Sequence, residues 1–183
     1  MRVHSTAIQG LKIIETAPYE DARGVFVRLY CERELADLVF PRRIVQVNHS
    51  RTFAVGAVRG LHFQHPPDAE MKLVRCLKGR IWDVAVDLRR NSKTFLQWHG
   101  EELTSVNGKM ILIPEGFAHG FQVLESESEL LYLHTGFYNP EAEGALRYNE
   151  PSIGIGWPLP VTDISVRDQQ HPLINKDFFG IDL

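Results

Sequence analysis

Short segments of alternating apolar and polar residues, each closed by turn residues, limit what this chain can fold into. The clearest segment runs from Arg80 to Leu88. In a strand every second residue faces one side, which gives one face Trp82, Val84, Val86 and Leu88. Similar segments follow at nearly regular spacing with little helix between them, and this pattern predicts an all-β sandwich or barrel. The other predicted strands are Leu11–Glu15, Val25–Tyr30, Ile44–His49, Ala57–Gln64, Lys72–Cys76, Gln97–Leu103, Met110–Ile113, His119–Leu124 and Glu129–Thr135.

Outside these segments the chain has one helical pattern and a long irregular end. The segment Cys31–Leu38 is predicted to be a helix with Leu35 and Leu38 on its buried side, ended by Pro41. In residues 139–183 proline and glycine are common and periodicity is weak, so we expect this segment to wrap around the barrel. A length of 183 residues suits one domain, residues 1–183.

Charge and hydrophobicity exclude several classes of partner. The formal net charge is −3 and no basic stripe is present, so no nucleic-acid partner is expected. No apolar run approaches membrane-spanning length and the first residues lack an apolar signal core, so we expect a cytoplasmic protein with no membrane partner. The two cysteines, Cys31 and Cys76, have neither a disulfide framework nor zinc-site spacing, and we expect both to be small buried residues.

Three residues that can carry chemistry lie close together in the sequence: Arg59, His62 and Lys72. We expect their two strands to be neighbours joined by a Pro-rich loop, which returns Lys72 to the vicinity of His62. Regular alternation places His62 beside Gly60, which would leave open space next to the imidazole, and Arg59 on the other face. Arg59 and His62 can therefore share a site only if the strand is twisted or bulged. A backbone-bonded buried histidine is the simple alternative, but two nearby cations favour a site for an anion or oxyanion.

Pattern alone leaves the other candidate residues open. His119 lies between glycine-flanked aromatic residues, which suits a tight turn as well as a metal ligand. The chain has no close His-x-His pair, because its nearest two histidines, His62 and His65, flank a Pro-rich loop, so no metal site is expected. Tyr132 fits a core tyrosine or a general acid. The sequence around Asp168 predicts a solvated loop charge.

Eight stretches, taken together, match one protein family in its own order and cover almost the whole chain. They are Asp21–Gly24, Gln46–Ser50, Val58–Gln64, Lys72–Cys76, Asp83–Asp87, Ile113–Phe121, Glu141–Gly144 and Gly154–Pro158. As a set they resemble the dTDP-4-dehydrorhamnose 3,5-epimerases and related sugar-nucleotide epimerases. The resemblance implies a cupin-type jelly-roll barrel with short peripheral helices, and an epimerase that needs neither a metal nor a redox cofactor.

The resemblance also implies roles for single residues. His62 matches the base that removes a proton beside the sugar ketone, and Asp168 matches its carboxylate partner. Tyr132 matches the acid that returns a proton on the opposite face, and Lys72 matches the cation near the developing enolate. Phe26 falls where a neighbouring subunit lines the pocket, which implies a homodimer. The positions that match contacts to a nucleotide-sugar substrate are Arg23, Phe26, Arg28, Gln46, Asn48, Arg59 (toward diphosphate), Lys72, His119, Tyr138 (stacked on the base), Glu143 and Arg167.

The chain departs from the family pattern mainly near the nucleotide. Arg28 stands where a glutamate is usual, Phe137 where a tyrosine is usual, and Arg167 where a lysine is usual. His134 lies in a Tyr-Leu-His-Thr stretch where the family often has Tyr-Lys-Thr. The alternatives are therefore a monofunctional 3- or 5-epimerase and an enzyme for a GDP- or CDP-linked 4-keto sugar. The intact catalytic set disfavours a non-catalytic cupin binding protein, and the missing ligand pair disfavours a metal-dependent cupin oxygenase.

Overall fold

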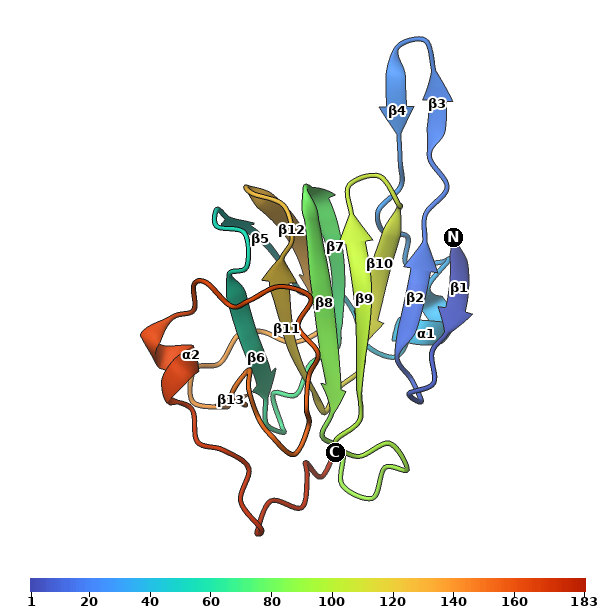
Figure 1. Cartoon of the computed structure of the whole chain (residues 1–183). Helices are drawn as coiled ribbons and strands as arrows, with labels where there is room; N and C mark the ends of the chain where they lie inside the picture. Colours follow the sequence, from blue (N-terminus) through green and yellow to red (C-terminus); the bar gives the residue numbers. More distant parts are fainter.

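The computed structural model describes residues 1–183, and its strands form two antiparallel sheets that pack face to face (Figure 1). The first sheet has the order β1 (Arg2–Ser5), β2 (Lys12–Glu15), β10 (Lys109–Ile113), β7 (Lys72–Lys78), β12 (Ser128–His134) and β5 (Gln46–Thr52). The second has the order β13 (Glu143–Ala145), β6 (Val58–Gln64), β11 (Phe117–Val123), β8 (Arg80–Asp87) and β9 (Trp98–Thr104). A separate hairpin joins β3 (Tyr19–Asp21) to β4 (Gly24–Phe26), and the two helices are α1 (Ala36–Val39) and α2 (Val166–Gln170). The expected all-β jelly roll with short peripheral helices is confirmed.

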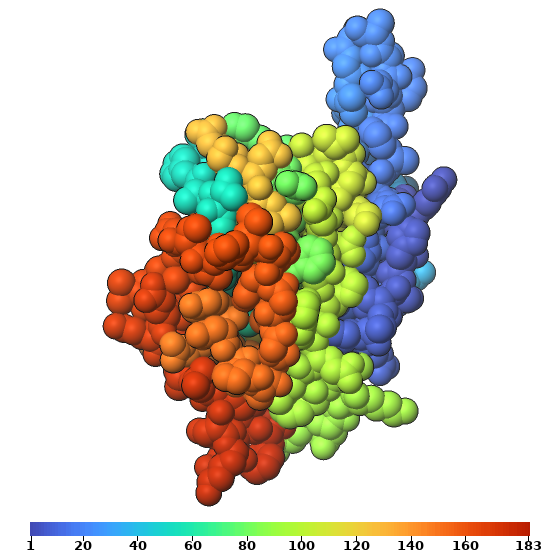
Figure 2. All heavy atoms as spheres, in the orientation of Figure 1, coloured from blue at the N-terminus to red at the C-terminus, as the bar shows by residue number.

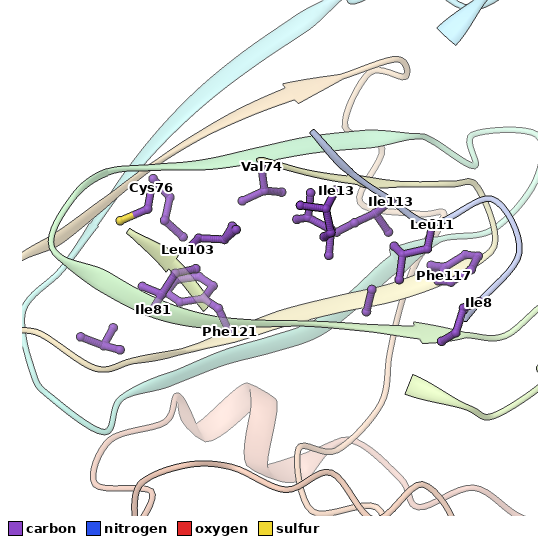
Figure 3. Packing of buried hydrophobic residues seen from close by; sticks show 14 of the residues in the cluster. Ile8, Leu11, Ile13, Val74, Cys76, Ile81, Leu103, Ile113, Phe117 and Phe121 are labelled. Carbon is purple, nitrogen blue, oxygen red and sulfur yellow. The ribbon is translucent and has the colours of Figure 1, made fainter. Parts of the chain in front are cut away.

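Apolar side chains from the inner faces of both sheets fill the space between them (Figure 3). Val74 and Cys76 come from the first sheet, and Ile81 and Phe121 come from the second. Inward-facing residues of two packed sheets interdigitate in this way because successive side chains alternate between the two faces. The prediction of a buried cysteine is confirmed for Cys76, whereas Cys31 is only half-buried.

The second sheet is also covered on its outer face. Trp82, Val84 and Val86 of β8 share one face, as predicted, and that face points away from the first sheet. The C-terminal segment runs across it (Figure 1), as the sequence predicted. The apolar residues that this segment contributes are Ile153, Ile155, Trp157, Ile174, Phe178 and Ile181.

Several local predictions differ from the structure. β6 and β7 are not neighbours but belong to opposite sheets, because the loop between them crosses from one sheet to the other. The predicted helix Cys31–Leu38 is reduced to the short helix α1. Leu35 directly precedes α1, and its side chain cannot form the hydrogen bond that would cap the start of a longer helix. Leu35 is nevertheless fully buried, as expected.

The hairpin of β3 and β4 projects away from both sheets (Figures 1 and 2). The predicted strand Val25–Tyr30 consequently ends at Phe26, because β4 pairs only with β3. Neither helix of the structure combines the length and the apolarity that crossing a membrane requires.

Candidate active site

A cavity of about 570 Å³ opens between the two sheets, where β5, β7 and β12 face β6 and β11. Most of the residues that line it are polar or charged, unlike the apolar residues that fill the space between the two sheets elsewhere. The cavity is therefore suited to a polar ligand. It brings together the following residues predicted from the sequence: Gln46, Asn48, Arg59, His62, Lys72, His119, Tyr132, Tyr138 and Glu143.

A bulge in β6 places Arg59 and His62 on the same wall. His62 pairs with His119 and Arg59 pairs with Phe121, so three steps along β6 match two steps along β11. The extra residue reverses the alternation of side chains, and both Arg59 and His62 line the cavity. The bulge that the sequence analysis required is present.

The expected open space at Gly60 is not present. Its φ is +128°, and a Cβ atom at this position would lie 2.5 Å from the Cα atom of Gly120. Gly60 is needed for the close approach of β6 and β11 at the bulge. The imidazole of His62 reaches the cavity because of the bulge, not because of a missing side chain.

The imidazole of His62 is hydrogen-bonded to the carboxylate of Asp168. Nε2 of His62 donates to Oδ1 of Asp168 over 2.7 Å, because a carboxylate has only acceptors. Asp168 is 5% exposed, so its prediction as a solvated charge was wrong, whereas its implied pairing with His62 is seen. The backbone amide of Asp168 donates to Oγ of Ser165, which caps α2 and orients the carboxylate.

The electrostatics of this pair favour an ionised carboxylate. Burial alone would raise the pKa of Asp168. The hydrogen bond and charge of His62, together with the amide of Gly60, lower this pKa by a larger amount, so it lies below its usual value. With Nε2–H of His62 committed to Asp168, the neutral ring carries its free lone pair on Nδ1. That nitrogen is able to accept a proton.

Tyr132 lies on the opposite wall, on β12. Its hydroxyl is 3.1 Å from Oγ of Ser50, and its ring lies next to the rings of His119 and His134. Burial raises the pKa of Tyr132 far above its usual value, although the hydrogen bond with Ser50 opposes this change. The phenol therefore keeps its proton near neutral pH and is a donor.

Lys72 reaches the same cavity from β7. Its Nζ is 3.3 Å from Oε1 of Glu70 and donates to the carbonyl oxygen of His62 over 3.4 Å. Nδ1 of His134 donates to the other oxygen of Glu70 over 2.9 Å, and the side-chain amide of Asn48 lies 3.3 Å from Nε2 of the same ring. Burial raises the pKa of Glu70, but His134 and Lys72 lower it by more, so this carboxyl stays ionised.

Glu70 was missed as a site residue, and so was the role of His134. One signal was available for His134: alternation on β12 places it on the same side as Tyr132. For Glu70 the sequence offered only its position two residues before Lys72.

The imidazole of His119 is hydrogen-bonded to a buried carboxylate. Its Nε2 donates to Asp83, 2.9 Å and 3.1 Å from the two carboxylate oxygens, and both side chains are buried. Asp83 was not predicted as part of the site. A carboxylate in the middle of a buried strand was the available signal, because such charges are rarely buried without a partner.

At the rim of the cavity Tyr138 and Glu143 are joined. The hydroxyl of Tyr138 donates to Glu143 over 3.0 Å, and the amide of Tyr138 donates to Oε1 of Gln46 over 3.1 Å. Arg167 forms an ion pair with Glu143 from outside the cavity. The ring of Tyr138 remains about half exposed, as a stacking platform requires.

Within one chain, four predicted substrate contacts lie outside the cavity: Arg167, described above, and three residues on or just after the hairpin of β3 and β4. Arg23 and Phe26 belong to the hairpin of β3 and β4, where Arg23 pairs with Asp21 and Phe26 is 74% exposed. This hairpin projects from the rest of the molecule (Figure 2). Arg28 follows the hairpin and pairs with Glu34 over 2.6 Å.

A jelly roll with a carboxylate-backed histidine and a protonated tyrosine on facing walls has the acid–base arrangement that a cupin-type isomerase requires. Residues 5–176 match the family model described as dTDP-4-dehydrorhamnose 3,5-epimerase. The chain belongs to this family and is therefore a sugar-nucleotide epimerase. This excludes the binding-protein and oxygenase alternatives.

Individual relatives agree with the family match. The dTDP-4-dehydrorhamnose 3,5-epimerase of Salmonella typhimurium is 41% identical, over 96% of this chain and 97% of that protein. The crystal structure of dTDP-6-deoxy-D-glucose-3,5-epimerase from Legionella pneumophila, in complex with dTDP-4-keto-L-rhamnose, has a TM-score of 0.91 at 38% identity and covers 98% of this chain and 97% of that chain. A dTDP-4-dehydrorhamnose 3-epimerase of Streptomyces niveus is 35% identical, over 95% of this chain and 84% of that protein.

Proposed function

We propose that this protein inverts C-3 and C-5 of dTDP-4-dehydro-6-deoxy-D-glucose with its own acid–base groups. One observation carries the proposal: His62, backed by Asp168, and Tyr132 lie on opposite walls of one cavity. Inverting a carbon centre requires a base on one face and an acid on the other. The ligand named for the Legionella pneumophila relative, dTDP-4-keto-L-rhamnose, supports the choice of substrate.

In the first step Nδ1 of His62 takes the proton from the carbon beside the ketone. The electrons of the C–H bond form the enolate, and the negative charge moves to the ketone oxygen. Asp168 holds the tautomer that leaves Nδ1 free and then stabilises the imidazolium. A proton beside a ketone becomes accessible to an imidazole only when the enolate is stabilised.

Lys72 supplies that stabilisation. Glu70 and the carbonyl of His62 hold its ammonium in place before a substrate binds. A fixed cation in a partly buried site needs no rearrangement when charge develops on the oxygen. The resulting enolate is planar at the reacting carbon, so a proton can return on either face.

Tyr132 completes the inversion by giving its phenolic proton to the other face of the enolate. Its raised pKa keeps the donor protonated until the enolate forms, and the Ser50 hydroxyl is placed to support the phenolate that results. Before the second centre reacts, the imidazolium of His62 releases its proton to solvent and the phenolate of Tyr132 takes a proton from solvent. The same pair of groups then acts at the second centre, on the other side of the ketone.

The nucleotide lies at the rim in this proposal, with Tyr138 stacked on the base and Arg59 near the diphosphate. Both side chains line the cavity, and Gln46, Asn48 and His119 provide polar contacts between them. We further propose a homodimer in which the hairpin of one subunit places Arg23 and Phe26 at the partner's cavity. Exposure of Tyr19 (67%) and Phe26 (74%) on a projecting hairpin supports this, since such aromatic surface marks an interface.

A 3-epimerase is the second candidate, favoured by the Streptomyces niveus relative. Incubation with dTDP-4-dehydro-6-deoxy-D-glucose in deuterated water, followed by NMR, tests both. Deuterium at C-3 and C-5 together with inversion at both supports the proposal, and incorporation at C-3 alone shows a 3-epimerase. GDP- and CDP-linked 4-keto sugars form parallel arms. No incorporation from the dTDP sugar contradicts the proposed function.

A further inference from the structure

A second histidine stands beside the His62–Asp168 pair. His171 follows Asp168 by three residues at the end of α2, and its Nε2 is 3.7 Å from Oδ1 of Asp168. Its ring approaches the ring of His62 edge-on, with 6.3 Å between centroids. Nε2 of His171 is buried and has no hydrogen-bond partner. A buried nitrogen aimed at a carboxylate without a bond is an exception that needs an explanation.

The three side chains together form a set of metal donors. One ring nitrogen of His62, a carboxylate oxygen of Asp168 and one ring nitrogen of His171 all lie within 4.8 Å of one another. Two imidazole nitrogens and one carboxylate are a common donor set for zinc with an open fourth position. Zn–N and Zn–O distances of about 2.0–2.2 Å place the donors of a tetrahedral ion roughly 3.4 Å apart. The 2.7 Å and 3.7 Å separations at Asp168 lie on either side of that spacing, so small side-chain shifts suffice.

The surrounding charges allow a cation here. Asp168 contributes one negative charge to the donor set. Lys72 on the cavity wall is engaged by Glu70 and Arg167 on α2 by Glu143, whereas Arg59, also on the cavity wall, donates to the hydroxyl of Thr52. The side chain of His62 is 33% exposed, which provides access from the cavity.

We propose that His62, Asp168 and His171 bind Zn²⁺, and that the bound ion switches the epimerase off. Coordination through Nε2 of His62 replaces its hydrogen bond to Asp168 and puts the ring proton on Nδ1. The ring then has no lone pair left to accept a proton from the sugar. The proposed Zn²⁺ site does not depend on the proposed function, whereas the loss of activity rests on the proposed role of His62 as the base.

Calorimetric titration of the full chain with ZnCl₂, after removal of metal by a chelator, tests the site. The variants are His171→Ala, the more conservative His171→Gln, and a control, His99→Ala, in which a histidine paired with Glu101 on β9 is removed. We expect one tight Zn²⁺ site per chain, weakened at least about tenfold in both His171 variants and unchanged in His99→Ala. Equal affinity in wild type and a folded His171 variant, or no stoichiometric binding, overturns the proposal. Co²⁺, used as a coloured probe, should be coordinated by fewer nitrogen atoms in both His171 variants than in the wild type.

Solvent exchange with the dTDP sugar then tests the switch. Zn²⁺ is expected to stop exchange in the wild type, whereas both His171 variants keep their activity at the same Zn²⁺ concentration. Tight binding that depends on His171 but leaves exchange intact overturns the switch and contradicts the proposed base, while the metal site itself stands. Absence of exchange in metal-free wild type instead shows that the proposed function fails, and the calorimetric result remains valid.

Discussion

Nε2 of His62 and Oδ1 of Asp168 lie 2.7 Å apart, although 106 residues separate them in the sequence. The strand β6 positions the first residue and α2 positions the second. The C-terminal segment therefore has two functions, because it covers the outer face of the second sheet and also supplies the partner of the histidine.

Replacing His62 with alanine is expected to remove proton exchange at both sugar centres. A general base contributes on the order of 10²–10⁴-fold in rate, so exchange should fall by about that factor. Binding of dTDP, measured by calorimetry, should change little, because the proposed nucleotide contacts lie at the rim of the cavity. His99→Ala serves as the matched control and should retain full exchange. Exchange close to the wild-type rate in His62→Ala contradicts the assignment of the base.

Tyr132→Phe is expected to separate proton removal from inversion. The change deletes the hydroxyl that lies 3.1 Å from Ser50 and keeps the ring, so packing is little disturbed. His62 can still remove a proton and return it on its own face. NMR in deuterated water should show continued exchange and a large loss of epimer.

Two other outcomes for Tyr132→Phe are informative. Equal loss of exchange and epimerisation means that the tyrosine also acts in proton removal. Full retention of epimerisation shows that another group is the acid.

Glu70→Gln is expected to destabilise the fold in a pH-dependent manner. The folded state lowers the pKa of Glu70, so its ionised form stabilises the protein above the pKa of an unfolded glutamate, about 4.3. That stabilisation is lost as the pH falls through the lower pKa of the folded state. Denaturant unfolding at one protein concentration should give a difference of about 1–3 kcal/mol between wild type and variant at pH 7, decreasing below pH ~4. A difference independent of pH contradicts the ionised state of Glu70.

Mixing two inactive variants tests the proposed exchange of hairpins between subunits. Arg23→Ala removes a hairpin residue and His62→Ala removes the proposed base, so each homodimer should be nearly inactive. In a hybrid dimer, the subunit with intact His62 receives an intact hairpin from its partner. Random mixing of equal amounts makes about half of the dimers hybrids, and one of the two sites in each hybrid is complete. The mixture should therefore show about a quarter of wild-type activity. No recovery after subunit exchange, or a fully active monomer by light scattering, contradicts the proposal.

The sequence predicted the strands well because β-strands repeat every two residues, and this repeat is visible locally. It did not show the bulge itself, because the extra residue of β6 is defined only against its partner β11. It also placed β6 and β7 side by side, since the Pro-rich loop between them fits a hairpin as well as a crossing between sheets. Pairing and sheet membership are set by long-range packing, which local alternation does not contain.

The polar network of the site was even less visible. Asp168 resembles a loop charge until α2 is folded against β6, and only the family resemblance indicated its partner. Glu70 and His134 meet because a loop and β12 converge at the cavity, across 64 residues. Neither contact leaves a periodic trace in the sequence.

Arg28 is the departure from the family pattern that bears most directly on the choice of nucleotide. Arginine has donors only and cannot accept a hydrogen bond from the N–H of thymine as a glutamate can, so contact between Arg28 and the base would weaken the binding of dTDP. In the structure its guanidinium donates to Glu34 over 2.6 Å, and Glu34 also accepts from the N-terminus of Met1 over 2.7 Å. This pairing favours the alternative in which Arg28 does not touch the base.

We therefore expect Arg28→Gln and Arg28→Glu to leave the affinity for dTDP within about threefold of wild type, which is less than 1 kcal/mol. Calorimetric titration of each protein with dTDP, GDP, CDP and UDP measures this. The ring of Tyr138 can stack on any base, so all four should bind measurably, with dTDP the tightest. A tenfold gain in dTDP affinity for Arg28→Glu, or a wild type that prefers GDP or CDP, shows instead that Arg28 reads the base and that the natural substrate carries a different nucleotide.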